Sequence, residues 1–254
     1  MKKKIILTTL FLSLLFSAVC VYGQNTKSYD DSIADLVGAM SAYGRGEAAF
    51  GQKNYDKAIT EFNEAIRLNP SYKDAYAMRG LAHYYKKNYD NAIADYTKTI
   101  QLNPDSVETY YTMRGGSYFS IKDYDRAIAD FTKSIQLNPN SADAYTMRGV
   151  AYFIKKDYSR AIPDLTKAIQ MDPNYVGNYT MRGTSYYFTK DYDRAITDYT
   201  KVIQLAPNNL EAYVYRGLSY YQKGDKNRAL TDANAALQID PNNESAKELY
   251  SKLK

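Results

Sequence analysis

The sequence has very little of the chemistry that builds metal sites and nucleophile systems. It contains one cysteine, Cys20, one histidine, His83, and no tryptophan. Cys20 lies in the N-terminal leader, so a chain without its leader has no cysteine and needs no disulfide. Without a thiol or a second imidazole, the usual zinc sets and the Cys-His and Ser-His nucleophile systems cannot be assembled. We therefore expect a protein that is not an enzyme and that has no cofactor and no metal site.

A long apolar run occurs only at the start of the chain. Three lysines precede an apolar run over residues 5–19, and small, uncharged residues follow around Gly23. This is the layout of a secretory signal peptide. The run is shorter than the roughly 20 residues that a membrane-spanning helix needs. We expect an exported protein that is periplasmic, at the cell surface or secreted; a membrane is a partner only if the leader is retained or Cys20 is lipidated.

Excess positive charge is also scarce once the leader is removed. The formal charge of the whole chain is +5, but loss of three leader lysines leaves 30 basic against 28 acidic residues. No run of five or six like charges remains in that chain. A protein that neutralises many phosphates needs such a surplus of cations. We therefore expect no nucleic-acid partner.

What the sequence does contain is one unit repeated six times. Arg-Gly recurs at intervals of 34, 35, 34, 34 and 34 residues, and a proline stands 25 residues after each arginine. In each unit, apolar residues recur at helical spacing in two stretches, so each unit is predicted to be a pair of helices. The prolines close the second helices. They are Pro70, Pro104, Pro139, Pro173, Pro207 and Pro241.

Acidic residues gather at the start of the second helix of each unit. An Asp or Asn stands just before this helix, where its side-chain oxygen can cap free backbone N–H groups. Pairs such as Asp123 with Asp125 suggest calcium, but they lack the glycine and the distal glutamate of an EF-hand loop. We interpret these acids as helix caps and as partners of the helix dipole.

A period of 34 residues built from two helices resembles the tetratricopeptide repeat (TPR). Two departures recur: tyrosine replaces the family's tryptophan, and arginine replaces its leucine. The resemblance implies an all-α fold, a right-handed α-solenoid of six TPR-like helix pairs. It also implies a noncatalytic scaffold that binds a peptide or partner segment in a concave groove. The fourth unit matches the family pattern at Tyr145, Gly149, Tyr152, Ala161, Leu165 and Pro173, with Arg148 in the leucine position.

The repeat also sets the predicted boundaries. Residues 1–23 are the signal peptide, residues 24–38 are an N-terminal arm with the start of the first helix, and residues 39–243 hold the repeats. Apolar residues at helical spacing near the end, such as Ala246 and Leu249, predict a capping helix over 244–254. One unit alone buries too little apolar surface to fold, so the units must stack. The repeats are 39–72, 73–106, 108–141, 142–175, 176–209 and 210–243.

Each recurring arginine has an acidic residue 16 positions later. Helices that pack antiparallel within one unit would bring the two charges together, so we predict six structural ion pairs. The alternative is a ladder of exposed arginines that binds anions; the matched acids favour pairing, because partly buried charges are usually paired. The pairs are Arg45 with Glu61, Arg79 with Asp95, Arg114 with Asp130, Arg148 with Asp164, Arg182 with Asp198, and Arg216 with Asp232.

Two recurrent series on the first helices are candidates for partner binding. Aromatic and methionine side chains suit adaptable apolar recognition of a protein or peptide. For both series, packing between repeats is the alternative, and for methionine it is favoured. Because aromatic faces also stack on sugar rings, the alternative function is glycan or cell-wall binding through the aromatic series. The candidates are Phe50, Tyr84, Phe119, Phe153, Tyr187 and Tyr221, with Met78, Met113, Met147 and Met181.

Two further departures from the pattern are interpreted as structural. His83 stands where other units carry tyrosine, so we expect it to pack against the helix pair as an aromatic substitute. Pro163 lies near the start of a second helix, where its missing N–H costs less than it would in the middle.

Overall fold

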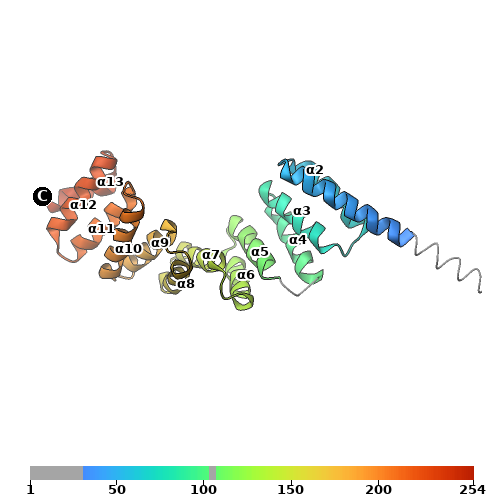
Figure 1. Cartoon of the computed structure of the whole chain (residues 1–254). Helices are drawn as coiled ribbons and strands as arrows, with labels where there is room; N and C mark the ends of the chain where they lie inside the picture. The colour runs from blue at the N-terminus through green and yellow to red at the C-terminus, as the bar shows by residue number, and fades with distance from the viewer. Residues whose placement is uncertain (1–30, 103–106) are drawn as a thin grey trace, which may run out of the picture. The chain divides into compact units, whose positions relative to one another are not determined.

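The computed structural model describes residues 31–102 and 107–254, and all regular secondary structure in these residues is α-helical (Figure 1). The predicted signal peptide and Cys20 lie outside the described residues. No helix among those described has both the length and the apolarity to cross a bilayer. The chain divides into two compact units, Met1–Asn103 (unit 1) and Pro104–Lys254 (unit 2).

The helices follow the predicted pairs closely. In unit 1, a helix runs over residues 31–51 and is followed by α2 (Tyr55–Leu68), α3 (Lys73–Tyr85) and α4 (Tyr89–Leu102). Unit 2 contains α5 (Glu108–Ser120), α6 (Tyr124–Leu137), α7 (Ala142–Ile154), α8 (Tyr158–Met171), α9 (Val176–Phe188), α10 (Tyr192–Leu205), α11 (Leu210–Gln222), α12 (Lys226–Ile239) and α13 (Glu244–Leu253).

Each helix packs against the one before it and the one after it within its unit. In unit 2, α7 packs against α8 to form a pair, and α8 packs in turn against α9, the first helix of the next pair. The same alternation links α2, α3 and α4 in unit 1. This nearest-neighbour packing is the architecture of an α-solenoid.

Glycine allows the two helices of a pair to approach closely. A Cβ atom added to Gly149 would lie 3.0 Å from Cγ of Leu165 on the facing helix. In the next pair, a Cβ added to Gly183 would lie 3.2 Å from Cβ of Asp198. The glycine of each Arg-Gly dipeptide in these pairs therefore sits where the second helix leaves little room for a side chain.

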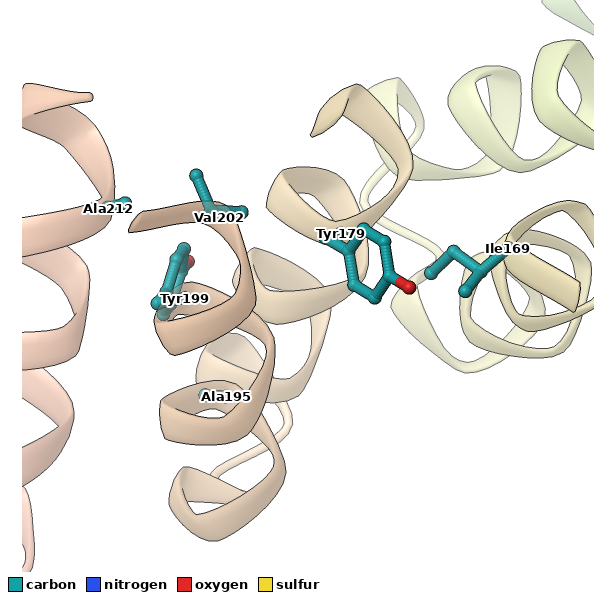
Figure 2. Close-up of a cluster of buried hydrophobic side chains, with 6 residues drawn as sticks. All are labelled: Ile169, Tyr179, Ala195, Tyr199, Val202 and Ala212. Carbon is teal, nitrogen blue, oxygen red and sulfur yellow. The ribbon is translucent and has the colours of Figure 1, made fainter. Parts of the chain in front are cut away.

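The apolar core of unit 2 runs from one pair into the next. One cluster brings together side chains from α8, α9, α10 and α11 (Figure 2). Tyr199, one of its two tyrosines, is fully buried, and the Tyr199 hydroxyl shares a hydrogen bond of 2.8 Å with Thr184 Oγ1. Burial raises the pKa of Tyr199. Because the cluster's members come from successive helix pairs, the core of each of these pairs is completed by side chains of its neighbours. Its members are Ile169, Tyr179, Ala195, Tyr199, Val202 and Ala212.

The turn inside each pair has a repeated backbone conformation. The N–H of Lys122 donates to the carbonyl of Phe119 at 2.9 Å, and the N–H of Asp123 donates to the carbonyl of Tyr118 at 2.9 Å. These two bonds form a Schellman motif, whose penultimate residue must adopt positive φ. Lysine occupies that residue in five turns, at a cost of about 1 kcal/mol each relative to glycine. They are Lys53, Lys87, Lys122, Lys156 and Lys190, with φ from 59° to 65°.

The residue after the turn lysine caps the second helix in α2, α6, α8 and α10, as predicted. The Asp157 side chain accepts a hydrogen bond from the N–H of Arg160, and Asn54 plays the same part in the first pair. Helix α8 continues without a break through Pro163.

The ends of the described chain differ. Helix α13 covers the last pair with Ala246 and Leu249, which are buried, where the sequence predicts a capping helix. The helix over residues 31–51 instead exposes apolar side chains near its start, such as Leu36 and Val37.

Candidate functional site

The first helices of unit 2 share one continuous surface. Helix α5 contacts α7, α7 contacts α9, α9 contacts α11, and α11 contacts α13. No comparable contact joins successive second helices among the described residues of this unit. First helices are thus closer to one another than second helices are, so unit 2 curves with its first helices on the inner side. We call the surface formed by α5, α7, α9 and α11 the inner face.

The methionine series places one side chain on each of three successive first helices. Met113, Met147 and Met181 are half-buried, so each has a packed side and an exposed side. In unit 1, Met78 packs against a buried cluster around Phe62, as the packing alternative predicts. A Cβ added to Gly116 on α5 would meet nothing within 4 Å. The surface beside that residue is therefore open.

The aromatic series is also half-buried. Five of its six members contact the tyrosine that begins the second helix of the same pair, in edge-to-face geometry. The sixth, Tyr221, stands in the pair where Lys226 takes the place of that tyrosine. The ring centroids are 5.4 Å apart for Phe50 and Tyr55, 5.4 Å for Tyr84 and Tyr89, 5.3 Å for Phe119 and Tyr124, 5.7 Å for Phe153 and Tyr158, and 5.8 Å for Tyr187 and Tyr192.

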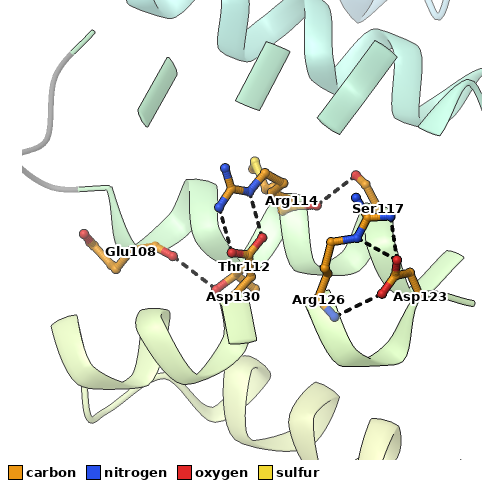
Figure 3. A network of polar contacts seen from close by, with 8 residues as sticks. Glu108, Thr112, Arg114, Ser117, Asp123, Arg126 and Asp130 are labelled. Carbon is orange, nitrogen blue, oxygen red and sulfur yellow. Dashed lines mark hydrogen bonds and ion pairs between the residues drawn. The ribbon is translucent and has the colours of Figure 1, made fainter. Parts of the chain in front are cut away.

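The structure brings each recurring arginine to its matched acid. Arg148 Nε and Nη2 each donate to one carboxylate oxygen of Asp164 at 2.7 Å. Figure 3 shows the same two-bond geometry for Arg114 and Asp130, at 2.8 Å for both bonds. Three further pairs have it: Arg79 with Asp95, Arg182 with Asp198, and Arg216 with Asp232.

The first of the six pairs is formed in a different setting. Arg45 lies 2.8 Å from Glu61, but its side chain is 52% exposed, whereas that of Arg148 is 17% exposed. No preceding helix pair covers Arg45 among the described residues. The later pairs are enclosed by their neighbours in the stack, and burial raises the pKa of Asp198 even though Arg182 bonds to it.

A third contact of the arginines joins one helix pair to the one before it. Arg182 Nη1 donates to Thr166 Oγ1 at 3.0 Å, and Arg216 Nη1 donates to Thr200 Oγ1 at 3.1 Å. All three guanidinium nitrogens of Arg182 are thus engaged within the protein, which disfavours the anion-binding alternative. These threonines were not predicted from the sequence, although each stands 16 residues before its arginine and this interval was a usable signal.

His83 lies where the repeat predicts a packing role. It is half-buried, and its Nδ1 is buried without a hydrogen-bond partner among the described residues. Burial lowers the pKa of this imidazole, which favours the neutral form. Within residues 31–102 and 107–254, no three His, Cys, Asp or Glu side chains are grouped so as to hold a metal ion.

Solved structures of repeat proteins resemble this fold. YrrB, described as a TPR protein with an unusual peptide-binding site, is 22% identical, with a TM-score of 0.70 over 75% of this chain and 97% of YrrB. The MamA protein is 29% identical, with a TM-score of 0.63 over 66% of this chain and 92% of MamA. The C-terminal part of a TPR protein from Cytophaga hutchinsonii is 20% identical, with a TM-score of 0.69 over 83% of this chain and 84% of that chain.

Family models identify the repeat directly. A tetratricopeptide repeat model matches residues 34–107 and 180–244, which together exceed half of the chain. A second tetratricopeptide repeat model matches residues 142–175, and a TPR repeat model matches residues 115–155. A comparison with curated proteins found no match. With the helix pairs and their spacing, these matches establish that the chain belongs to the tetratricopeptide repeat family.

Proposed function

We propose that this protein is a noncatalytic interaction scaffold outside the cytoplasm, and that the inner face of unit 2 binds an extended peptide or a partner segment. The family and the fold support a role in protein–protein interaction. The observation behind the finer proposal is the contact between successive first helices, because α5, α7 and α9 each carry one half-buried methionine and one half-buried aromatic side chain of the two candidate series.

The spacing of the helices suggests what such a ligand looks like. Packed helices lie about 8–10 Å apart, and an extended chain advances roughly 3.3 Å per residue. A peptide that crosses the first helices would therefore meet a new methionine about every third residue. Unbranched methionine adapts to ligand side chains of different shape. We expect the ligand to carry apolar residues at about that interval.

A glycan ligand on the aromatic series is less well supported. A sugar ring stacks on an aromatic ring whose face is free, but Phe119 and Phe153 are half-buried and already contact Tyr124 and Tyr158. YrrB, which has a similar fold, is a TPR protein with an unusual peptide-binding site, and this likeness of fold favours a peptide ligand.

A selected peptide can test the inner face. A random peptide library would be panned on the chain, and the affinity of an enriched peptide would be measured by fluorescence anisotropy. Met147→Gln with Met181→Gln should weaken binding roughly tenfold, because polar side chains replace two apolar contacts. The matched control is Met171→Gln, at the half-buried end of second helix α8, and it should bind normally.

Circular dichroism and thermal unfolding would show that the variants are folded. Equal loss of binding in the control, or a library with no enriched peptide, would contradict the proposed inner face.

The exported location rests on the leader and needs its own test. Mass spectrometry of the protein from its native cells should find a mature N-terminus at Gln24, with the protein in the envelope or the medium. An intact leader on cytoplasmic protein would contradict export while leaving the inner-face proposal untouched.

A further inference from the structure

The turns inside the helix pairs of unit 2 form a second continuous surface. The turns between α5 and α6, α7 and α8, and α9 and α10 are tied together by side chains. Lys155, beside the second turn, forms an ion pair with Asp125, beside the first. Phe188, beside the third, stacks on Tyr158, beside the second, with ring centroids 5.0 Å apart and planes 9° apart. We call these three turns the turn edge.

Each of these turns carries a lysine in a conformation that favours glycine. The φ angles of Lys122, Lys156 and Lys190 are 63°, 60° and 65°. The following turn has Gly224 at φ 81°, so glycine is compatible with this turn geometry. All three lysines are exposed, and none forms an ion pair with a residue that the structure describes. Lysine thus occupies these turns although glycine would fit the backbone conformation with less strain. Backbone strain of this kind is typical of functional sites.

The first turn also borders an open hollow with unbalanced charge. The hollow has a volume of about 450 Å³ and is lined in part by three cations and two acids. Asp123 is bound by Arg126, and Asp125 is bound by Lys155. Lys122 is the cation left without an acidic partner among the lining residues. A ligand in this hollow should therefore carry a negative charge.

Exposed apolar side chains also lie close to these turns in the sequence. Phe188 is 49% exposed although it stacks on Tyr158, and Ile154 is 42% exposed. An exposed ring beside cations suits a ligand with both flat apolar faces and anionic groups. Sugar acids combine these features, because the C–H face of a pyranose packs on aromatic rings while its carboxylate pairs with lysine.

The backbone of the turn edge disfavours a peptide that binds as an added strand. The N–H of Lys156 donates to the carbonyl of Phe153 at 2.8 Å, and the N–H of Asp157 donates to the carbonyl of Tyr152 at 2.9 Å. Strand addition needs free main-chain donors and acceptors along an edge. Here the main chain is engaged within the turn, so recognition depends on side chains.

We propose that the turn edge of unit 2 is a second binding surface, independent of the inner face, and that it takes a linear anionic polysaccharide. Lys122, Lys156 and Lys190 would pair with successive acidic groups, and Phe188 would stack on a sugar ring. A repeating polymer matches a surface that itself repeats once per helix pair. Because surface ion pairs are screened by salt, binding should weaken as ionic strength rises.

Glycine substitution gives a test that separates binding from folding. Lys122→Gly, Lys156→Gly and Lys190→Gly together remove three charges and also relieve the backbone strain, so the unfolding midpoint should hold or rise. Polygalacturonate binding, measured by affinity electrophoresis and calorimetry with the full chain, should weaken roughly tenfold. The control is Lys133→Gln, Lys167→Gln and Lys201→Gln, which removes equal charge from second helices α6, α8 and α10 and should bind normally.

Other probes distinguish the ligand classes. Phe188→Leu should weaken polygalacturonate binding severalfold, and neutral dextran should not bind. If the glycine triple variant and the glutamine control lose polygalacturonate affinity equally, the effect comes from overall charge, and the proposal is overturned. Preferential binding of polyglutamate or oligothymidylate would assign the edge to an acidic protein or a nucleic acid instead, and no binding to any probe would also overturn it. Because the triple does not touch the inner face, its peptide affinity should stay unchanged whichever result is obtained.

Discussion

Two regions of unit 2 each contain ion pairs between a basic side chain and an aspartate, but the pairs differ in geometry and in exposure to solvent. Inside the stack, Arg148 binds Asp164 through two hydrogen bonds, and the two side chains are 17% and 8% exposed. At the turn edge, Lys155 pairs with Asp125, and the side chains are 33% and 84% exposed. The planar guanidinium fits a carboxylate in one fixed geometry, whereas the flexible ammonium does not. Arginine therefore supplies the enclosed pairs inside the stack. At the turn edge the pairs are exposed, and arginine forms some of them as well as lysine, since the side chain of Arg126, which binds Asp123, is 62% exposed.

The comparison also separates the ion pairs that stabilise the fold from the charged side chains that can bind a ligand. A buried pair has lost its water, so removal of one partner leaves a charge with no compensation. An exposed pair contributes little and exchanges partners freely. The internal pairs should thus control folding, and the lysines of the turn edge are free to meet a ligand.

Breaking one internal pair should have the largest effect. Asp164→Ala leaves the guanidinium of Arg148 half-buried and without its carboxylate, so the free energy of unfolding should fall by about 3–5 kcal/mol. Urea unfolding followed by far-UV circular dichroism measures the change.

The double variant Arg148→Leu with Asp164→Leu tests the cause. It restores the leucine that the family usually has and leaves no buried charge, so it should recover most of the lost stability. If the double variant is as unstable as Asp164→Ala, the ion pair stabilises the fold more than two leucines do, and the loss in Asp164→Ala is not explained by an unpaired charge alone.

Breaking the bond between neighbouring pairs should have a smaller effect. Thr166→Val removes the acceptor of Arg182 Nη1 but leaves the ion pair to Asp198. Loss of a hydrogen bond from a charged donor should lower the free energy of unfolding by about 1–2 kcal/mol. Thr197→Val is the matched control, because the Thr197 hydroxyl, which is exposed, donates to the Asp193 carbonyl. Equal loss from both variants would mean that the contact to Arg182 adds nothing.

Sequence periodicity was enough to predict the fold, because the repeat has one dominant signal. Helix pairs require apolar residues at helical spacing, a polar cap and a terminating proline, and each is visible in the chain. The fixed interval of 16 residues placed Arg148 opposite Asp164 for the same reason. Helix α13 was visible because Ala246 and Leu249 continue the apolar spacing beyond the last proline.

The surfaces were harder to predict than the core. A half-buried ring such as Phe153 looks the same in a helical projection whether it packs or binds, and its contact with Tyr158 depends on the angle between two helices. The strain at Lys156 was also invisible, because positive φ is a property of the turn geometry and not of the lysine. Pairing across turns, as between Lys155 and Asp125, needs the stacking geometry of two units.

The caps at the turn edge lead to a pH-dependent prediction. The hydrogen bond from the Arg160 side chain lowers the pKa of Asp157. A carboxyl whose folded pKa lies below its unfolded value, about 3.9, stabilises the fold above that value. This contribution is lost as the pH falls through the folded pKa. Asp157→Asn, which resembles the natural cap Asn54, should reduce the dependence of the unfolding midpoint on pH between about 5 and 2. An unchanged slope would mean that Asp157 is not linked to folding.

The exposed pairs of the turn edge should matter least for stability. Lys155→Gln removes the partner of Asp125, but water already solvates that carboxylate, which is 84% exposed. The free energy of unfolding should change by less than about 0.5 kcal/mol, as measured by urea unfolding beside Asp164→Ala. Added salt should change the unfolding midpoints of the Lys155→Gln variant and the parent chain alike, since an exposed pair is already screened. If Lys155→Gln lowers the free energy of unfolding as much as Asp164→Ala does, the turn edge has a structural role, and its lysines would be explained by their contribution to stability.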